Sequence, residues 1–253
     1  GRPKTGPSMS APAKIAILGG AGGIGRQLIK ELKDAGQNPV VLDLAPSLER
    51  HDLCQGGIAI DVTNQKSVTA AFAQLAKLGP LSGFVNLAGY NTELVPLAKT
   101  SATYFDEILS ANLRGAFLAA QAALPLLHGK NASLVHVSSG LAQNVRPGYG
   151  AYSASKAAVI AMTKTLAQEN APRVRVNAVA PGLVDTAFLR GGTGRSDETS
   201  DSIVNLKAYQ DATPMGRIAL PADITGPIRF LLGQDSGFMT GQVLWVNGGG
   251  YMP

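Results

Sequence analysis

The sequence predicts one α/β domain in which helices cover both faces of a parallel sheet. Short apolar segments alternate with segments of helical periodicity from near the start of the chain to about residue 180. Parallel strands need long crossover connections, and right-handed crossovers place helices on each side of the sheet. The chain has 253 residues, 45% of them hydrophobic, with no internal repeat and no linker. We therefore expect a single doubly wound sheet of about seven strands.

Seven segments have the length and apolar character of buried strands. Glycine, proline or polar residues bound them, as expected where strands enter and leave a core. In chain order they cover residues 14–18, 39–44, 57–62, 81–87, 133–138, 173–178 and 241–246.

Four segments between these strands have helical periodicity. In the first, Ile24, Leu28, Ile29 and Leu32 recur on one helix face, and Gly36 supplies a stop. The expected helices cover residues 24–35, 65–78, 105–127 and 152–170.

Composition excludes several classes of protein. No run of eighteen or more uninterrupted apolar residues occurs, which excludes a membrane-spanning helix. Charged residues make up only 15% of the chain, too few for a disordered protein of this length. Cys54 is the single cysteine and cannot form an internal disulfide, so we expect a reduced, cytoplasmic protein. The three histidines show no metal-ligand spacing, and no metal is expected.

Residues 1–8 are interpreted as an expression-tag remnant, because Met9 begins a plausible native start. Leaving out Arg2 and Lys4 takes Lys plus Arg from 22 to 20 against 17 Asp plus Glu, so the net charge falls from +5 to +3. The remaining basic residues are scattered, whereas nucleic-acid binding needs a basic patch. We expect residues 9–253 to form one domain without a nucleic-acid or membrane partner.

One segment departs from the strand–helix alternation. Residues 190–201 are polar and glycine-rich, lack periodicity and follow the end of a strand. Ligands of open α/β sheets bind beyond the carboxyl ends of the strands. We therefore interpret 184–215 as a lid over a substrate; a disordered surface loop is the alternative.

Five glycines between residues 19 and 25 fill the turn after the first strand. Glycines permit a tight turn and let backbone N–H groups approach phosphate oxygens at a helix N-terminus. Asp43 ends the next strand, 18 residues after Gly25. A carboxylate there accepts hydrogen bonds from adenosine ribose hydroxyls and repels a 2′-phosphate. Neither Leu44 nor Gly22 supplies a positive charge that would bind a 2′-phosphate, so the sequence favours NAD over NADP. The alternative interpretation of Asp43 is a turn residue at the end of the strand, without a role in binding.

Tyr152 and Lys156 stand four residues apart, on one face of an expected helix. Free tyrosine has a pKa of about 10 and is a poor base at neutral pH. A nearby lysine cation and a positive nicotinamide ring favour the phenolate, so we expect a lowered pKa.

Together these features make the chain resemble the short-chain dehydrogenase/reductase family, in its compact form. The resemblance runs from about Ala13 to the C-terminus. The matching features are the glycine turn, Asp61 with Val62, Asn86 to Gly89, Asn112, Ser138 with Ser139, Tyr152 with Lys156, residues 177–182 and residues 238–249. It implies a Rossmann-type fold, a homotetramer and hydride transfer between a nicotinamide and a CH–OH group.

The resemblance also implies four catalytic roles. Tyr152 would exchange a proton with the substrate oxygen, and Lys156 would bind the nicotinamide ribose and keep the Tyr152 pKa low. Ser139 would hydrogen-bond the substrate oxygen; Ser138 is the rival for that role. Asn112 would hold a water that connects Lys156 to solvent.

Cofactor contacts carried over in the same way lie along the strand ends. Besides Tyr152 and Lys156 they are Gly19, Gly22, Gly23, Ile24, Gly25, Asp43, Asp61, Val62, Asn86, Ala88, Gly89, Pro181, Gly182, Val184 and Thr186. Leu18, Leu87 and Asn247 depart from the family pattern at positions that we interpret as structural.

The sequence thus indicates an NAD-dependent oxidoreductase that interconverts a secondary alcohol and a ketone. The alternative from another class is a catalytically silent NAD-sensing or scaffold protein on the same fold. An epimerase or dehydratase of the same family is a further alternative. Such enzymes usually carry an extra C-terminal substrate domain, and the residues after Thr186 are too few to form one easily.

The substrate pocket is expected to combine apolar and amide side chains with no arginine clamp. Its expected lining is Leu141, Gln143, Asn144, Tyr149, Leu183 and the segment from Phe188 to Met215. This lining favours a neutral or weakly polar small molecule, and thioesters, polyols, sugars, cyclic alcohols and steroid-like ketones all stay open.

Overall fold

The computed structural model describes residues 14–190, 198–199, 201–202 and 204–253. Its centre is a seven-stranded sheet in the order β3-β2-β1-β4-β5-β6-β7, with every neighbouring pair parallel. The strands are β1 (Lys14–Leu18), β2 (Asn38–Asp43), β3 (Ile58–Ala59), β4 (Leu81–Asn86), β5 (Ser133–Val137), β6 (Arg175–Pro181) and β7 (Val243–Val246). The doubly wound sheet predicted from the sequence is confirmed.

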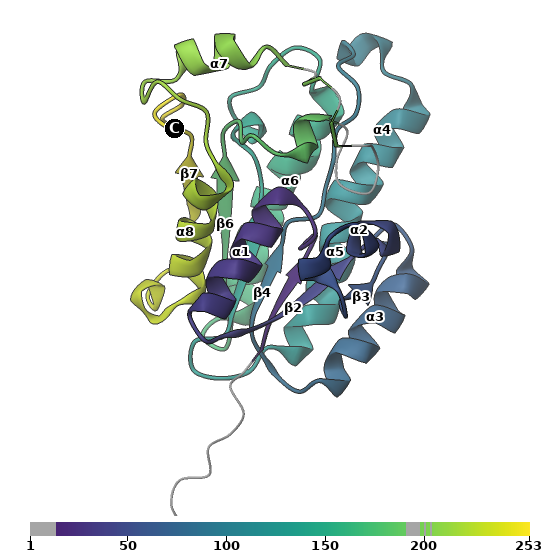
Figure 1. The fold of residues 1–253 in the computed structure, drawn as a ribbon, viewed down its shortest axis with the longest axis vertical. Coiled ribbons are helices and arrows are strands. Elements are labelled where there is room, and N and C mark those ends of the chain that lie inside the picture. Colours follow the sequence, from purple (N-terminus) through teal and green to yellow (C-terminus); the bar gives the residue numbers. More distant parts are fainter. Residues whose placement is uncertain (1–13, 191–197, 200, 203) are drawn as a thin grey trace, which may run out of the picture.

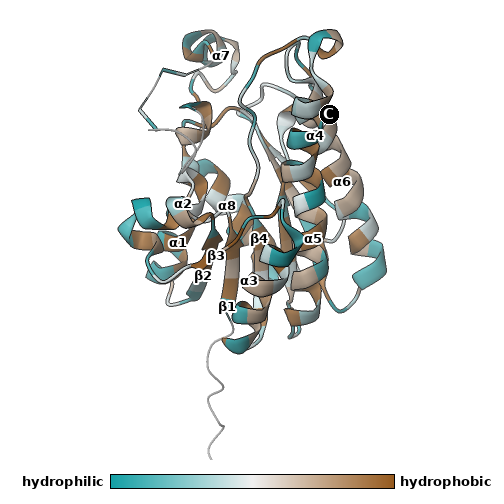
Figure 2. Ribbon diagram, turned by 90° about the vertical axis from the view of Figure 1, so that its right-hand side faces the viewer, coloured by the Kyte–Doolittle hydropathy of each residue, from teal (hydrophilic) through white to brown (hydrophobic). Residues whose placement is uncertain are grey.

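Helices cover both faces of the sheet (Figures 1 and 2). One face carries α1 (Gly23–Asp34) and α8 (Pro221–Leu232). Their buried residues, such as Leu28 and Ile228, share a core with Ile17 of β1 and Val135 of β5. The opposite face carries α3 (Gln65–Lys77), α5 (Gly115–Ala123) and α6 (Gly150–Asn170). Burial of these apolar faces is the main force that holds the three layers together.

The strand order reverses between β1 and β4, because β2 and β3 lie on one side of β1 and the later strands on the other. Crossovers therefore leave the sheet in opposite directions at this point, and a crevice opens beyond the carboxyl ends of β1 and β4. The carboxyl ends of the strands face the end of the molecule where α7 (Leu206–Ala212) lies (Figure 1).

The helix expected over 105–127 is interrupted. It consists of α4 (Ala102–Leu109), a π-helical turn (Ser110–Arg114) and α5. A π-helical turn inserts an extra residue into the helix and is common at functional sites. Here the turn contains Asn112, whose side chain hydrogen-bonds a distant backbone segment.

Three helices of the structure were not expected from the sequence: α2 (Ala45–Arg50), α7 and α8. Helix α8 contains Pro227, and an internal proline argues against a helix. Pro221 in its first turn and the Asp223 carboxylate, which accepts the Leu220 N–H at 2.8 Å, nevertheless start the helix firmly. Across the described residues, no helix is long and apolar enough to cross a membrane.

Candidate active site

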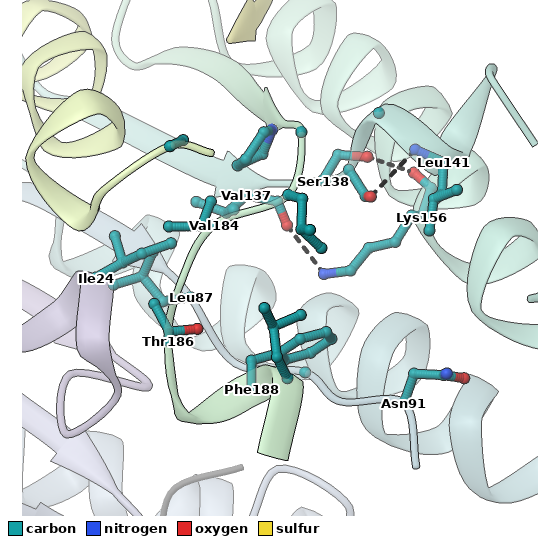
Figure 3. Close-up of a pocket in the computed structure, with 18 of the residues that line it drawn as sticks. Ile24, Leu87, Asn91, Val137, Ser138, Leu141, Lys156, Val184, Thr186 and Phe188 are labelled. Atoms are coloured by element: carbon teal, nitrogen blue, oxygen red, sulfur yellow. Dashed lines mark hydrogen bonds between the residues drawn. The ribbon is translucent and has the colours of Figure 1, made fainter. Parts of the chain in front are cut away.

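A cavity of about 480 Å³ opens at the carboxyl ends of the strands. Its walls come from the segments that follow all seven strands, and from α6 and α7. Figure 3 shows side chains from the segments after β1, β4, β5 and β6, and from α6, around one space. The cavity thus occupies the position where open α/β sheets bind ligands.

The glycine turn forms one wall of this cavity. Gly19 has φ of +75°, a conformation that side chains disfavour. A Cβ added to Gly25 would lie 2.5 Å from the Gly20 Cα, so α1 can approach the sheet only without a side chain there. No side chain caps the N-terminus of α1, and its first turn contains no acidic residue. A helix N-terminus of this kind attracts anions, which fits the pyrophosphate of a dinucleotide.

Two carboxylates line the cavity beyond the glycine turn. Asp43 Oδ2 accepts a hydrogen bond from the Ala21 N–H at 3.0 Å, and Asp43 Oδ1 accepts one from the Leu44 N–H at 2.7 Å. Asp61 Oδ1 accepts the N–H and hydroxyl of Thr63 at 2.9 and 2.7 Å. These bonds fix both carboxylates at the ends of β2 and β3, where the adenosine part of a dinucleotide would lie.

Two adjacent serines follow β5 and have different environments. The Ser138 hydroxyl donates to the Lys156 carbonyl at 2.8 Å, so it ties the strand end to α6. The Ser139 Oγ accepts the Leu141 N–H at 3.1 Å and keeps its proton for another acceptor. Ser139 also lies near enough to Tyr152 to influence the pKa of its phenol. This difference favours Ser139 over Ser138 for contact with a substrate.

Helix α6 places Tyr152 and Lys156 on the cavity wall. The Lys156 Nζ donates to the Val137 carbonyl at 3.0 Å, as Figure 3 shows, and lies 5.7 Å from the centre of the Tyr152 ring. Burial lowers the pKa of Lys156 to about 8.

The structure does not show the lowered pKa expected for Tyr152. Burial raises the pKa of its phenol to about 12, and the Ser139 hydroxyl offsets only part of this effect. The reason is that desolvation disfavours the phenolate, while the Lys156 ammonium points to a backbone carbonyl. The phenol is therefore protonated at neutral pH in this structure.

Asn112 and Asn86 lie behind the cavity wall rather than on it. The Asn112 amide donates to the Tyr90 carbonyl and accepts the Tyr90 N–H, both at 2.9 Å, and also donates to Ser155 at 3.3 Å. The Asn86 Oδ1 accepts the Ala88 N–H at 2.9 Å. Both asparagines thus shape the segment after β4. A Cβ added to Gly89 in that segment would meet Asn112 Oδ1 at 2.9 Å and Lys156 Nζ at 3.2 Å.

The structure places the remaining expected cofactor residues on the cavity wall. They are Gly19, Gly22, Gly23, Ile24, Gly25, Val62, Ala88, Gly89, Pro181, Gly182, Val184 and Thr186. Thr186 packs on the glycine turn, where a Cβ on Gly23 would lie 2.8 Å from its methyl carbon.

The expected substrate residues Leu141, Asn144, Tyr149, Leu183 and Phe188 also line the cavity. The ring centres of Tyr149 and Phe188 lie 6.5 and 5.9 Å from that of Tyr152. Gln143 does not itself line the cavity; its Oε1 accepts the hydroxyl of Tyr251, which does, at 3.3 Å.

No arginine clamp was expected in the substrate pocket, but two arginines line the cavity. Arg146 and Arg217 both line the cavity, as do Tyr90, Asn91 and Tyr251, none of which the sequence analysis singled out. Arg146 lies on the connection between β5 and α6, and such connections meet at the carboxyl edge of a parallel sheet. That position is the signal that could have identified it.

Of the expected lid, residues 191–197, 200 and 203 lie outside the described part of the chain, as do residues 1–8. Within the described residues, Phe188, Val204, Tyr209 and Met215 of the 184–215 segment line the cavity. No cluster of three or more His, Cys, Asp or Glu side chains in the described part of the chain could hold a metal ion.

Fold and site together define a nucleotide-binding α/β oxidoreductase with a place for a nicotinamide dinucleotide. A family model described as enoyl-(acyl carrier protein) reductase matches residues 19–251. The chain is 33% identical to 4-formylbenzenesulfonate dehydrogenase of Comamonas testosteroni, over 95% of this chain and 99% of that protein.

Solved structures of related proteins have the same fold as this chain. A short-chain dehydrogenase/reductase of Brucella melitensis, described as a glucose/ribitol dehydrogenase, has a TM-score of 0.83 at 30% identity, over 95% of this chain and 97% of that one. A small-chain dehydrogenase in complex with NADPH has a TM-score of 0.77 at 25% identity, over 95% and 99% of the two chains. The chain belongs to the short-chain dehydrogenase/reductase family and is an oxidoreductase of alcohols and ketones.

Proposed function

We propose that the protein interconverts a secondary alcohol and a ketone with NAD(H) as its cofactor. One observation carries the proposal: Ser139, Tyr152 and Lys156 line the same cavity as the glycine turn and Asp43. A proton-transferring group and a dinucleotide cradle therefore open on one space, as hydride transfer with proton exchange requires.

The glycine turn and the N-terminus of α1 would hold the pyrophosphate, and Asp43 and Asp61 the adenosine. Pro181, Gly182 and Thr186 would border the nicotinamide, and Lys156 its ribose. A bound nicotinamide accepts or donates the hydride, so the protein must position the substrate carbon and move the proton.

Tyr152 would exchange that proton with the substrate oxygen. Its protonated phenol, with a pKa near 12, fits the role of an acid toward a ketone. Ser139 would hold the substrate oxygen, since its hydroxyl proton is not used by the Leu141 N–H bond. A positive charge from the oxidised nicotinamide would favour the phenolate in the reverse direction. Asn112 would support the path from Lys156 to solvent by fixing the backbone at Tyr90.

The NAD preference is supported by the charge at the end of β2. The Asp43 carboxylate lines the cavity there, and a 2′-phosphate would be repelled by it. Gly22 adds no basic side chain. The related structure with bound NADPH means that the family alone does not decide between the cofactors.

We further propose that the 184–215 segment covers the substrate. Phe188 lies 5.9 Å from the Tyr152 ring, measured between ring centres, and α7 contributes Tyr209 to the same wall. Excluding water from this space would strengthen the interactions around the reacting oxygen.

Absorbance of the reduced nicotinamide, followed with purified protein, tests the proposal. NAD and NADP are each combined with hydroxyacyl thioesters, polyols, sugars and cyclic alcohols, and the corresponding ketones are tested with NADH and NADPH. We expect NAD-linked turnover of one substrate group. NADH binding by fluorescence without any turnover would instead support the sensor or scaffold alternative, and an absence of binding would contradict the cofactor assignment.

A further inference from the structure

We infer that the substrate carries an oxyanion group, such as a carboxylate, sulfonate or phosphate, that pairs with Arg146 at the substrate end of the cavity. The inference rests on the proposed function and gives its substrate a chemical class. It comes from the distribution of charge on the cavity wall.

Carboxylates on the described wall are confined to three residues, Asp43, Asp61 and Asp223. Asp43 and Asp61 follow β2 and β3, at the end assigned to adenosine. Asp223 is paired with Arg217, whose two terminal nitrogens donate to its two oxygens at 2.6 and 2.8 Å. The charge of Arg217 is therefore neutralised within the protein.

Arg146 differs from Arg217. Its side chain is exposed and lines the cavity, and no carboxylate of the described residues lies within 4.0 Å of its guanidinium. Its guanidinium carbon lies 5.7 Å from the centre of the Tyr209 ring on α7. This aromatic contact orients the guanidinium but supplies no negative charge.

The surroundings of Arg146 suit an oxyanion. A guanidinium presents planar, paired donors that match the oxygens of carboxylate, sulfonate and phosphate. The neighbouring wall is aromatic: burial raises the pKa of Tyr149 to about 12, with Tyr209 adding to the shift.

Arg146 also stands apart from the reacting atoms. Arg146 contacts the ring of Tyr209 on α7, whereas the ring neighbours of Tyr152 are Tyr149 and Phe188, with centres 6.5 and 5.9 Å from its own. The oxyanion would therefore be a second group of the substrate, separated from the carbonyl that Tyr152 protonates.

A purely structural role for Arg146 is the competing explanation, in which it only holds Tyr209 and α7 in place. The two roles differ in what they predict for uncharged substrates. Loss of an anion site impairs the charged member of a substrate pair, whereas displacement of α7 impairs both members.

The test uses three matched pairs of ketones with NADH, each with and without the oxyanion. The pairs are para-acetylbenzoate and its methyl ester, para-acetylbenzenesulfonate and its sulfonamide, and acetoacetyl-CoA and acetoacetyl-N-acetylcysteamine. Wild type, Arg146→Gln and Arg146→Lys are compared. Lys130→Gln is the control, since this exposed lysine precedes β5 at the opposite edge of the sheet.

We expect at least one pair in which wild type prefers the anion and Arg146→Gln raises KM for the anion about tenfold or more. In that variant kcat and the neutral partner should change little, Arg146→Lys should lie between, and Lys130→Gln should match wild type. The pair that responds identifies the oxyanion.

Two outcomes would overturn the inference while leaving the proposed function in place. One is turnover of neutral ketones with no anion preference in wild type. The other is an Arg146→Gln variant whose kcat/KM falls by the same factor for the charged and the neutral member of each pair. Failure of every ketone to be reduced would count against the proposed function itself, and with it against this inference.

Discussion

The Asp43 carboxylate holds the glycine turn through the backbone N–H of Ala21, at 3.0 Å from Oδ2. On its other side, the Ala21 carbonyl accepts a hydrogen bond from Arg26, which is also bonded to His51 Nε2 at 2.8 Å. The end of β2 and the start of α1 are thereby linked through one residue of the turn. Asp43 consequently has two roles to test: its hydrogen bonds hold the glycine turn, and its charge is proposed to set the preference for NAD over NADP.

Asp43→Asn removes the charge and keeps one hydrogen bond to the turn. The amide oxygen can still accept the Ala21 N–H, the amide nitrogen cannot accept the Leu44 N–H, and the negative charge that repels a 2′-phosphate is lost. We expect the ratio of kcat/KM for NAD over NADP to fall about tenfold or more, mainly through a lower KM for NADP. Steady-state kinetics with both cofactors measure it.

Asp52→Asn is the matched control, because Asp52 is an exposed neighbouring carboxylate that does not line the cavity. It should leave the cofactor ratio at the wild-type value. If Asp43→Asn also leaves the ratio unchanged, Asp43 serves only to brace the turn.

The glycine turn offers a second paired test. In Gly25→Ala the new methyl would lie 2.5 Å from the Gly20 Cα, so the backbone must shift, at a cost of about 1–3 kcal/mol. In Gly22→Ala the nearest atom is 3.4 Å away and the backbone is extended, so little strain is expected. Thermal unfolding should show a lower Tm for Gly25→Ala only. Equal Tm values for the two variants would mean that the close approach of α1 is not required.

The parts of the site that the sequence predicted are encoded by neighbours along the chain. The glycine turn, Asp43 and the Tyr152–Lys156 pair each depend on one strand end or one helix, so short stretches of sequence point to them, and the family resemblance implies their roles. The same holds for most strands, whose bounds differ from the expected ones by a few residues.

What the sequence missed depends on contacts between distant segments. The π-helical turn at Asn112 is linked to Tyr90, 22 residues earlier, and helical periodicity carries no trace of that bond. The raised pKa of Tyr152 results from burial of its phenol, which spacing cannot reveal. Arg146 lines the cavity because a loop turns it there, next to Tyr209 of α7.

Removing the Tyr152 hydroxyl tests the proton-transfer step. Tyr152→Phe should lower kcat by at least about a hundredfold, because a positioned acid or base contributes at least that factor. NADH binding, measured by fluorescence titration, should stay within a few-fold of wild type. Tyr149→Phe removes the hydroxyl of a neighbouring phenol, and its kcat should fall far less than that of Tyr152→Phe. A Tyr152→Phe enzyme within tenfold of the wild-type rate would remove Tyr152 from its proposed role.

The buried charge of Lys156 lowers the stability of the folded protein. Only 5% of the residue is exposed, and the single hydrogen-bond acceptor that the structure shows for its ammonium is the Val137 carbonyl. Burial lowers its pKa from 10.5 to about 8. The unfolded chain therefore binds this proton more tightly than the native protein does, which destabilises the fold at neutral pH.

Lys156→Met should consequently be inactive but more stable than wild type at pH 7. Methionine fills a similar volume without a charge, and the freed Val137 carbonyl borders the cavity, where water can reach it. We expect Tm to rise by roughly 3 °C or more, the shift that about 1 kcal/mol produces in a domain of this size.

The pH dependence of the expected rise in Tm is an independent test of this explanation. The penalty in wild type is fully present below pH 8 and disappears as the pH rises toward 10.5, because the lysine is then neutral in the unfolded chain as well. The difference in Tm between Lys156→Met and wild type should therefore be largest at pH 6–7 and shrink by pH 10. Lys164→Met, on the exposed side of the same helix, should show no such trend. A Lys156→Met variant that is less stable than wild type at pH 7 would mean that the Val137 bond outweighs the buried charge.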